Sequence, residues 1–141
     1  MGQDVFQLVY LSRAVDGISY SDLSDILDRD REFNRRNGLT GILIYRDGFF
    51  IQLLEGGEAE VMDAMAERIR DRRHHHVQVV HEISATDRLF GEWAMAFHDG
   101  DLDADGEPGL METLFQLARE ARRPKLEIMT PLARLSRRYA I

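Results

Sequence analysis

The sequence of 141 residues contains no cysteine. This absence excludes disulfide bonds, thiolate metal sites, a catalytic thiol and photochemistry that proceeds through a cysteinyl adduct. The sequence also lacks an apolar run of about 20 residues, the length that a membrane-spanning helix requires. Its N-terminus shows neither the basic region nor the apolar region of a signal peptide. We therefore expect a single soluble domain that resides in the cytoplasm and does not associate with membranes.

An excess of positive charge is missing as well, since the formal net charge is −7. Residues 1–117 hold 11 basic and 23 acidic residues, whereas residues 118–141 hold seven basic and two acidic ones. An acidic body repels nucleic acid, so we do not expect DNA or RNA as a partner. The basic C-terminal segment could contact an acidic partner, or it could form the solvated faces of helices.

Apolar periodicity and turn residues divide the chain into a β-α-β-β-α-β-β series followed by two helices. Ser19 with Asp22, or Ser21 by itself, predicts the start of the first helix, and the Asn-Gly pair at 37–38 predicts its end. The Asp-Gly pair at 47–48 predicts a hairpin. A second, amphipathic helix is indicated by the helical spacing of Val61, Met62, Met65, Ile69 and Arg72. The expected strands cover residues 5–12, 39–46, 49–55, 77–83 and 90–97, and the last two helices cover 110–121 and a short segment from 130.

This order of elements is that of an α+β, ferredoxin-like fold with one strand added. We expect the first and third strands to be parallel neighbours, and the first two helices to cover one face of the sheet. The two C-terminal helices should cover the other face. Residues 1–98 would then form the core, and residues 99–141 would form an acidic loop and a helical cap within the same domain.

Three polar residues, Tyr10, Asn34 and Gln52, stand where the pattern predicts burial. Asn34 lies on the buried stripe of the first helix, and the hairpin places Gln52 opposite Leu43. If the first and third strands are adjacent, Tyr10 can lie beside Gln52. Such groups need partners when buried, so they either satisfy one another and the backbone or line a pocket for a planar polar ligand. Asp30, one turn before Asn34, is a candidate ion-pair partner for a neighbouring arginine.

Four separated motifs occur in the chain: LVYLSR at 8–13, Asn34 followed by NGLTG at 37–41, FFIQLLEG at 49–56, and EWAM at 92–95. Together they resemble the BLUF family, the flavin-binding sensors of blue light. One motif alone would mean little, but four that agree in spacing are specific. The resemblance implies that residues 1–98 hold FAD noncovalently, with the isoalloxazine ring between the first two helices and the sheet.

The resemblance also assigns roles to the three polar residues. Tyr10 matches the photoactive tyrosine of the family, and Gln52 matches the glutamine that bridges this tyrosine and the flavin. Asn34 matches the asparagine that holds the C4 carbonyl edge of the ring. Light would then drive electron and proton transfer from Tyr10, which rearranges Gln52 and its hydrogen bonds to the flavin and shifts the absorption slightly to the red.

Further site residues follow from the same resemblance. Asp71 and His74 match positions that line the ribityl and phosphate end of FAD, and the ring-packing residues would be Ile26, Leu43 and Phe50. Trp93 and Met95 match a pair on the last strand. Because they lie two residues apart, we expect both to face one side of that strand and to relay the signal to the C-terminal helices.

The resemblance implies a sensor without catalytic turnover. Its signal would pass to a separate output protein, for which a cyclic-di-GMP phosphodiesterase or a transcription regulator is plausible, and we expect a homo-oligomer. Two other classes of function remain open at this stage. One is a small hydrolase of the acylphosphatase type, for which residues 13–17 offer only a thin anion cradle. The other is a colourless dimerisation domain, which a purified protein without yellow colour would indicate.

Two patterns raise the possibility of a metal. Three consecutive histidines, at 74–76, do not point at one ion, so we expect no metal there. One of the arginines at 68–73 could reach the FAD phosphates instead of solvating the helix end. Asp101, Asp103, Asp105, Gly106 and Glu112 match the spacing of a calcium-binding loop, although a strand precedes them where a helix should. We expect an acidic surface loop, with calcium as the alternative.

Overall fold

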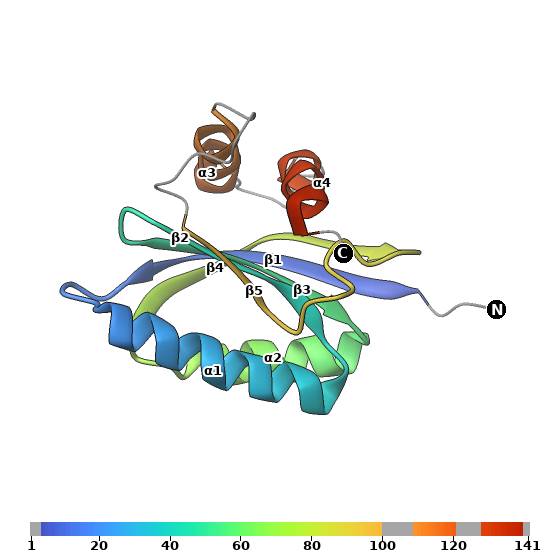
Figure 1. Cartoon of the computed structure of the whole chain (residues 1–141), viewed down its shortest axis with the longest axis horizontal. Helices are drawn as coiled ribbons and strands as arrows, with labels where there is room; N and C mark the ends of the chain where they lie inside the picture. Colours follow the sequence, from blue (N-terminus) through green and yellow to red (C-terminus); the bar gives the residue numbers. More distant parts are fainter. Residues whose placement is uncertain (1–3, 100–108, 121–127, 140–141) are drawn as a thin grey trace.

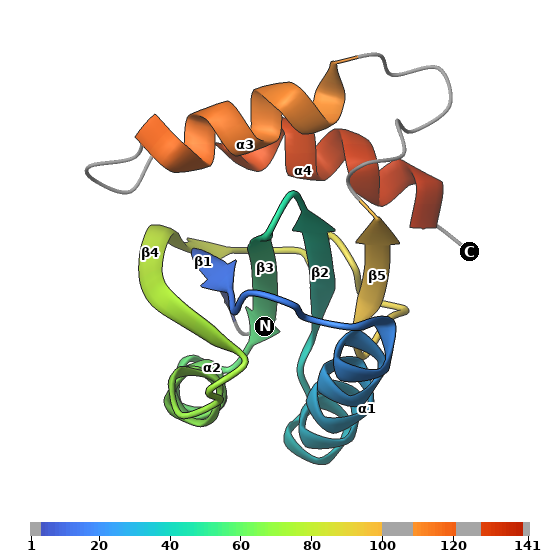
Figure 2. The ribbon, with the colours of Figure 1, turned by 90° about the vertical axis from the view of Figure 1, so that its left-hand side faces the viewer.

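The computed structural model describes residues 4–99, 109–120 and 128–139 (Figure 1). Five strands form one sheet, with two helices on each of its faces (Figure 2). This is the expected α+β, ferredoxin-like arrangement with a helical cap. The elements are β1 (Val5–Ala14), α1 (Tyr20–Asn37), β2 (Thr40–Arg46), β3 (Phe49–Gly56), α2 (Glu58–Ile69), β4 (His74–Ala85), β5 (Ala96–Asp99), α3 (Leu110–Glu120), α4 (Met129–Ser136) and a 3-10 turn (Arg137–Tyr139).

The strand order is β4-β1-β3-β2-β5. The first and third strands are neighbours, as predicted, but the prediction that they are parallel is wrong because β1 pairs with β3 antiparallel. The reason is the split crossover: α1 carries the chain back so that β2 runs in the direction of β1, and the hairpin then inserts β3 between them in the opposite direction. In the resulting register Gln52 lies between Tyr10 on β1 and Leu43 on β2.

The turn signals fold as the sequence predicts. Ser19 and Asp22 form a reciprocal capping box at the start of α1, and Gly38 ends that helix with φ 67°. Asp47 and Gly48 adopt φ values of 48° and 80° in the β2–β3 hairpin. Two residues with positive φ are what a type I′ turn requires, so the hairpin register is fixed locally.

The second helix is shorter than predicted and buries a different stripe. It ends at Ile69, and the side chains of Met62 and Ile69 are 48% and 59% exposed. The buried stripe consists of Val61, Ala64, Met65 and Arg68. From the sequence, Arg68 is one of the arginines expected either to solvate the helix end or to reach the FAD phosphates, and its burial in this stripe was not predicted.

Side chains alternate along the strands, so the sheet separates two cores. On the α1/α2 face the core includes Leu8 and Tyr10 of β1, together with Leu43, Phe50, Leu54 and Met95. On the α3/α4 face it includes Val9 and Leu11, together with Ile42, Ile44, Phe115 and Leu132.

In the described part of the chain no helix is long and apolar enough to cross a membrane.

The prediction of a strand over residues 90–97 is wrong for most of its length. β5 begins only at Ala96 and pairs in parallel with β2, while residues 90–95 form a loop. The backbone N–H groups of Leu89 and Phe90 donate to the Glu55 carboxylate at 2.6 and 2.8 Å. The backbone at the start of this loop thus binds a side chain instead of a neighbouring strand.

Candidate functional site

A pocket lies between α1, α2 and the sheet, with an empty volume of about 270 Å³, part of it open to solvent. Six of the residues that line it were predicted as site residues: Tyr10, Ile26, Leu43, Phe50, Asp71 and His74. Two further residues line it: Asp30, which the sequence did not place in the site, and Arg68, one of the arginines considered for the FAD phosphates. The structure therefore brings together residues from β1, α1, β2, β3, α2, the turn after α2 and β4.

Tyr10 and Gln52 are Cα partners on adjacent strands and share the α1/α2 face. The exposed fraction of Tyr10 is 2%, and Gln52 is fully buried. Burial raises the pKa of the Tyr10 phenol well above its ordinary value, and the nearby Asp30 carboxylate raises it further. Tyr10 therefore keeps its proton in the ground state and is available as a hydrogen-bond donor.

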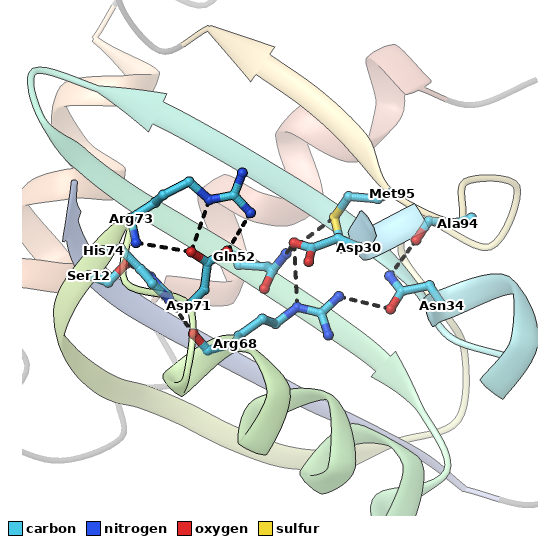
Figure 3. Close-up of polar contacts among 10 residues, drawn as sticks. All are labelled: Ser12, Asp30, Asn34, Gln52, Arg68, Asp71, Arg73, His74, Ala94 and Met95. Atoms are coloured by element: carbon cyan, nitrogen blue, oxygen red, sulfur yellow. Dashed lines mark hydrogen bonds and ion pairs between the residues drawn. The ribbon is translucent and has the colours of Figure 1, made fainter. Parts of the chain in front are cut away.

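The two ends of the Gln52 amide have different surroundings (Figure 3). Its Nε2 donates to Asp30 Oδ2 at 3.1 Å and lies 3.6 Å from the Met95 sulfur. Its Oε1 is buried, and no described residue donates a hydrogen bond to it. An unsatisfied buried acceptor is unfavourable, so this oxygen needs a donor. Gln52 is not among the residues that line the pocket, but it lies beside two of them, Tyr10 and Asp30.

Asn34 and Arg68 link α1 to α2 and to the loop before β5. Asn34 Nδ2 donates to the backbone oxygen of Ala94 at 2.6 Å, and its Oδ1 accepts from Arg68 Nη2 at 3.0 Å. Arg68 Nε lies 3.5 Å from Asp30 Oδ2, with side-chain exposures of 5% and 15%. This confirms Asp30 as the partner of an arginine. Burial raises the Asp30 pKa, while the Arg68 charge acts in the opposite direction.

The opposite end of the pocket carries Asp71 and His74. Arg73 donates to the Asp71 carboxylate through Nε and Nη2 at 3.0 and 2.8 Å. Although burial acts to raise it, the pKa of Asp71 is lowered, because the bonds from Arg73 favour the ionised form. His74 Nδ1 contacts the Ser12 hydroxyl at 2.8 Å, and its Nε2 contacts the backbone oxygen of Arg68. Both ring nitrogens are therefore engaged within the chain.

A wider groove between α1 and α2 adjoins the pocket and has an empty volume of about 1230 Å³, part of it open to solvent. Its walls carry charge of both signs, with five arginines, among them Arg29, Arg70 and Arg72, and five acidic side chains, among them Asp28 and Glu67. Together the two spaces provide a mainly apolar pocket and an adjoining charged groove. The apolar pocket suits a planar ring, and the arginines of the groove are the candidates for an anionic diphosphate.

Trp93 and Met95 do not face the same side, so that prediction is wrong. Met95 is buried in the α1/α2 core beside Gln52, whereas Trp93 packs against the α3/α4 core. The Trp93 indole N–H donates to the backbone oxygen of Tyr139 at 2.7 Å. The expected alternation failed because both residues lie in the loop before β5, where strand periodicity does not apply.

Within the described ranges no group of three or more histidine and acidic side chains could hold a metal ion. Most of the calcium-loop pattern, from Asp101 to Gly106, lies outside the described residues. Its last member, Glu112, is described and accepts a hydrogen bond from Arg46 at 2.9 Å.

Comparison with known proteins agrees with this site. The family model described as "Sensors of blue-light using FAD" (BLUF) matches residues 5–96. The photoactivated adenylate cyclase subunit beta of Euglena gracilis is 32% identical over 113 residues, which is 79% of this chain but only 13% of that relative. The chain therefore spans about an eighth of the length of this curated relative.

Two solved structures are similar in fold. The dark-state structure of BlrB, a BLUF protein, has a TM-score of 0.79 and 24% identity, and it covers 98% of this chain and 99% of its own. A bacterial light-regulated adenylyl cyclase has a TM-score of 0.73 and 28% identity, with 82% of this chain and 35% of the cyclase aligned. Because the family model spans the sheet and both helices of the pocket, the chain belongs to the BLUF family, the sensors of blue light that use FAD.

Proposed function

We propose that this protein is a blue-light photoreceptor that binds FAD noncovalently in the pocket between α1, α2 and the sheet. The observation that carries the proposal is the Gln52 amide, whose Oε1 is buried without a hydrogen bond from any described residue. Gln52 stands in register with Tyr10, a buried phenol that retains its proton. A donor, an acceptor and a pocket for the ring are thus adjacent.

When bound, FAD supplies a ring that absorbs blue light and whose excited state accepts an electron. Tyr10 would give up one electron to the flavin and its phenolic proton by way of Gln52 Oε1, the buried acceptor of the residue in register with it. Both return to Tyr10, so no net oxidation occurs and no covalent bond forms. Gln52 is left with its amide rotated or tautomerised, and its altered hydrogen bonding shifts the absorption slightly to the red.

The pocket residues hold the cofactor in this proposal. Ile26, Leu43 and Phe50 would provide the apolar walls for the ring, and Asp71 and His74 would lie toward the ribityl chain and the phosphates. The arginines of the adjoining groove would meet the diphosphate, among acidic neighbours.

Asn34 does not line the pocket, and both ends of its amide are bonded within the chain. To hold the carbonyl edge of the ring, its Nδ2 would exchange the bond to Ala94 for one to the flavin.

The signal would leave the pocket through the loop before β5. Met95 contacts Gln52 on one side of the sheet, and Trp93 reaches Tyr139 on the other. Residues 93–95 therefore connect the pocket with the C-terminal turn. The chain itself would act as a sensor without turnover and would signal to a separate output protein. A cyclic-di-GMP phosphodiesterase and a transcription regulator are two candidate classes, and the cyclase relatives add a third.

The test is the visible absorption spectrum of the purified protein, after reconstitution with FAD, before and after blue illumination. We expect a flavin spectrum that shifts slightly to the red in light and returns in the dark. Tyr10→Phe should retain the flavin and lose the shift. Tyr45→Phe is the matched control, because Tyr45 lies on β2, packs against Phe50 and is absent from the pocket lining.

The control variant should behave like the unmodified protein. A protein that takes up no FAD would contradict the binding proposal. A protein that binds FAD and shows no reversible shift would contradict the switch, and so would a full shift in Tyr10→Phe.

A further inference from the structure

The orientation of the Gln52 amide is set by a residue on another element. The Nε2 end points to Asp30 Oδ2, 3.1 Å away on α1, and the Oε1 end has no hydrogen bond from a described residue (Figure 3). Met95 sulfur, 3.6 Å from Nε2, is a weak acceptor and adds little preference. Asp30 is therefore the strongest group that distinguishes the two ends of the amide.

An ionised Asp30 favours one of the two possible orientations of the Gln52 amide. An ionised carboxylate only accepts hydrogen bonds, so it can bind the NH₂ end of an amide but repels the carbonyl end. While Asp30 is ionised, Gln52 must present Nε2 to α1. Its Oε1 is then left for the other groups of the pocket, and Tyr10 is the partner in the neighbouring strand.

Asp30 is surrounded by groups from several elements. Arg68 of α2 lies closest among the charges, with Nε 3.5 Å from Asp30 Oδ2, and it is tied in turn to Asn34. Asp71, after α2, and His74 of β4 also act on the Asp30 charge, and Tyr10 lines the same pocket. Arg68 thus gives the largest favourable charge and His74 a smaller one, and the side chain of Asp30 is only 15% exposed.

We propose that Asp30 is a positioning residue for Gln52: its carboxylate holds the amide with Oε1 available to Tyr10 and the flavin, and its protonation releases that hold. A protonated Asp30 carries an O–H donor, which would favour the opposite amide orientation with Oε1 toward α1. This inference rests on the proposed function, since it concerns the same glutamine. It adds a residue on α1 that decides the starting state of the switch.

The experiment follows Gln52 in the FAD-loaded protein kept in the dark. The side-chain amide of Gln52 is observed by ¹⁵N NMR from mildly alkaline to mildly acidic pH, and the flavin absorption maximum is recorded over the same range. We expect both to follow one titration, because the raised pKa of Asp30 brings its protonation toward that range.

Asp30→Asn is the central variant because it keeps the shape and removes the charge. An asparagine presents both a donor and an acceptor, so we expect two Gln52 amide signals and no titration of either readout. Asp30→Glu should restore a titration. Asp63→Asn, an exposed carboxylate of α2, changes the net charge equally and should titrate like the unmodified protein.

A second variant protects the test if Asp30→Asn fails to fold. Arg68→Gln keeps Asp30 and removes its counter-charge, so the titration of Gln52 should move to higher pH. The proposal is overturned if the unmodified protein shows no titration of the Gln52 amide. It is also overturned if Asp30→Asn or Arg68→Gln leaves the pH profile of the unmodified protein unchanged.

The two proposals fail in different ways. If illumination of the unmodified protein gives no reversible shift but Gln52 still titrates with Asp30, the photoreceptor function falls and the positioning role stands. If the light-induced shift occurs and Asp30→Asn leaves the dark titration intact, the positioning role falls and the function stands.

Discussion

Two clusters around acidic side chains lie at the ends of the loop that precedes β5, and they differ in how completely they are satisfied. Glu55 is fully buried and accepts from Gln7 Nε2 at 2.7 Å and from the N–H groups of Leu89 and Phe90 at 2.6 and 2.8 Å. The pocket cluster of Asp30 and Gln52 leaves an acceptor without a described donor. A saturated cluster stabilises a fold, whereas an unsaturated one marks a place for a ligand.

The loop before β5 contacts both clusters, one at each of its ends. At its start the backbone is bound to Glu55, and at its end Met95 contacts Gln52. The start of the loop is therefore fixed by Glu55, and its end at Met95 would respond to a change in the orientation of Gln52. The predictions below test this contrast, beginning with the largest expected effect.

Removal of the saturated carboxylate should be the most damaging change. Glu55→Ala removes the acceptor of two backbone donors, Leu89 and Phe90, and of two side-chain donors, Gln7 and Thr40. We expect it to lower the free energy of unfolding by about 3–5 kcal/mol. Urea denaturation measures the loss. Glu82→Ala, an exposed carboxylate on β4, is the control and should change stability by less than about 0.5 kcal/mol. If the two substitutions lowered the free energy of unfolding equally, the Glu55 cluster would have no special role in stability.

The next effect concerns the loop itself. Trp93→Ala removes the indole N–H bond to Tyr139 and part of the packing on the α3/α4 core, and it should cost about 2 kcal/mol. Because Met95 still contacts Gln52, the light-induced absorption shift should remain, while the change in hydrogen exchange at α4 should weaken. Trp93→Phe keeps the ring but lacks the N–H, so it separates the two contributions. An undiminished response of α4 in Trp93→Ala would exclude this route.

The smallest effect is a pH dependence from the pocket cluster. Burial raises the pKa of Asp30 in the folded state, although Arg68 acts in the opposite direction, so the folded protein retains this proton to higher pH than the unfolded chain. As pH rises from the unfolded value through the folded value, the stability of the unmodified protein relative to Asp30→Asn should therefore fall, and above that range it should be constant. Denaturation of both proteins at several pH values measures the difference. A relative stability that rises with pH would contradict the raised pKa.

Much of the fold follows from local signals. The capping box, the helix-ending Gly38 and the hairpin at 47–48 set α1 and the β2–β3 register, and this register places Gln52 beside Leu43 and Tyr10. The direction of β1 relative to β3 was wrong because it depends on how the two crossovers interleave, not on any residue within the strands.

The parts of the site that the sequence did not predict share one cause. In each, a side chain binds residues of another element that lies far away in the sequence. Glu55 binds the amides of Leu89 and Phe90, more than 30 residues later in the chain, at the start of the loop found where a strand was expected. Arg68 resembles a solvated helix end, yet its charge is satisfied by Asp30 and Asn34 from α1. Such pairings leave no periodic trace in the sequence, so only the folded chain reveals them.

The short β5 has a consequence for motion. Among the residues that the structure describes, it pairs along only four residues, Ala96–Asp99, and only with β2. Local opening requires less free energy where few ladder bonds must be broken, so this edge should exchange its amide protons sooner than β1 or β3, which are paired on both sides. Local opening of β5 can thus occur while β1, β2, β3 and β4 keep their pairing and register.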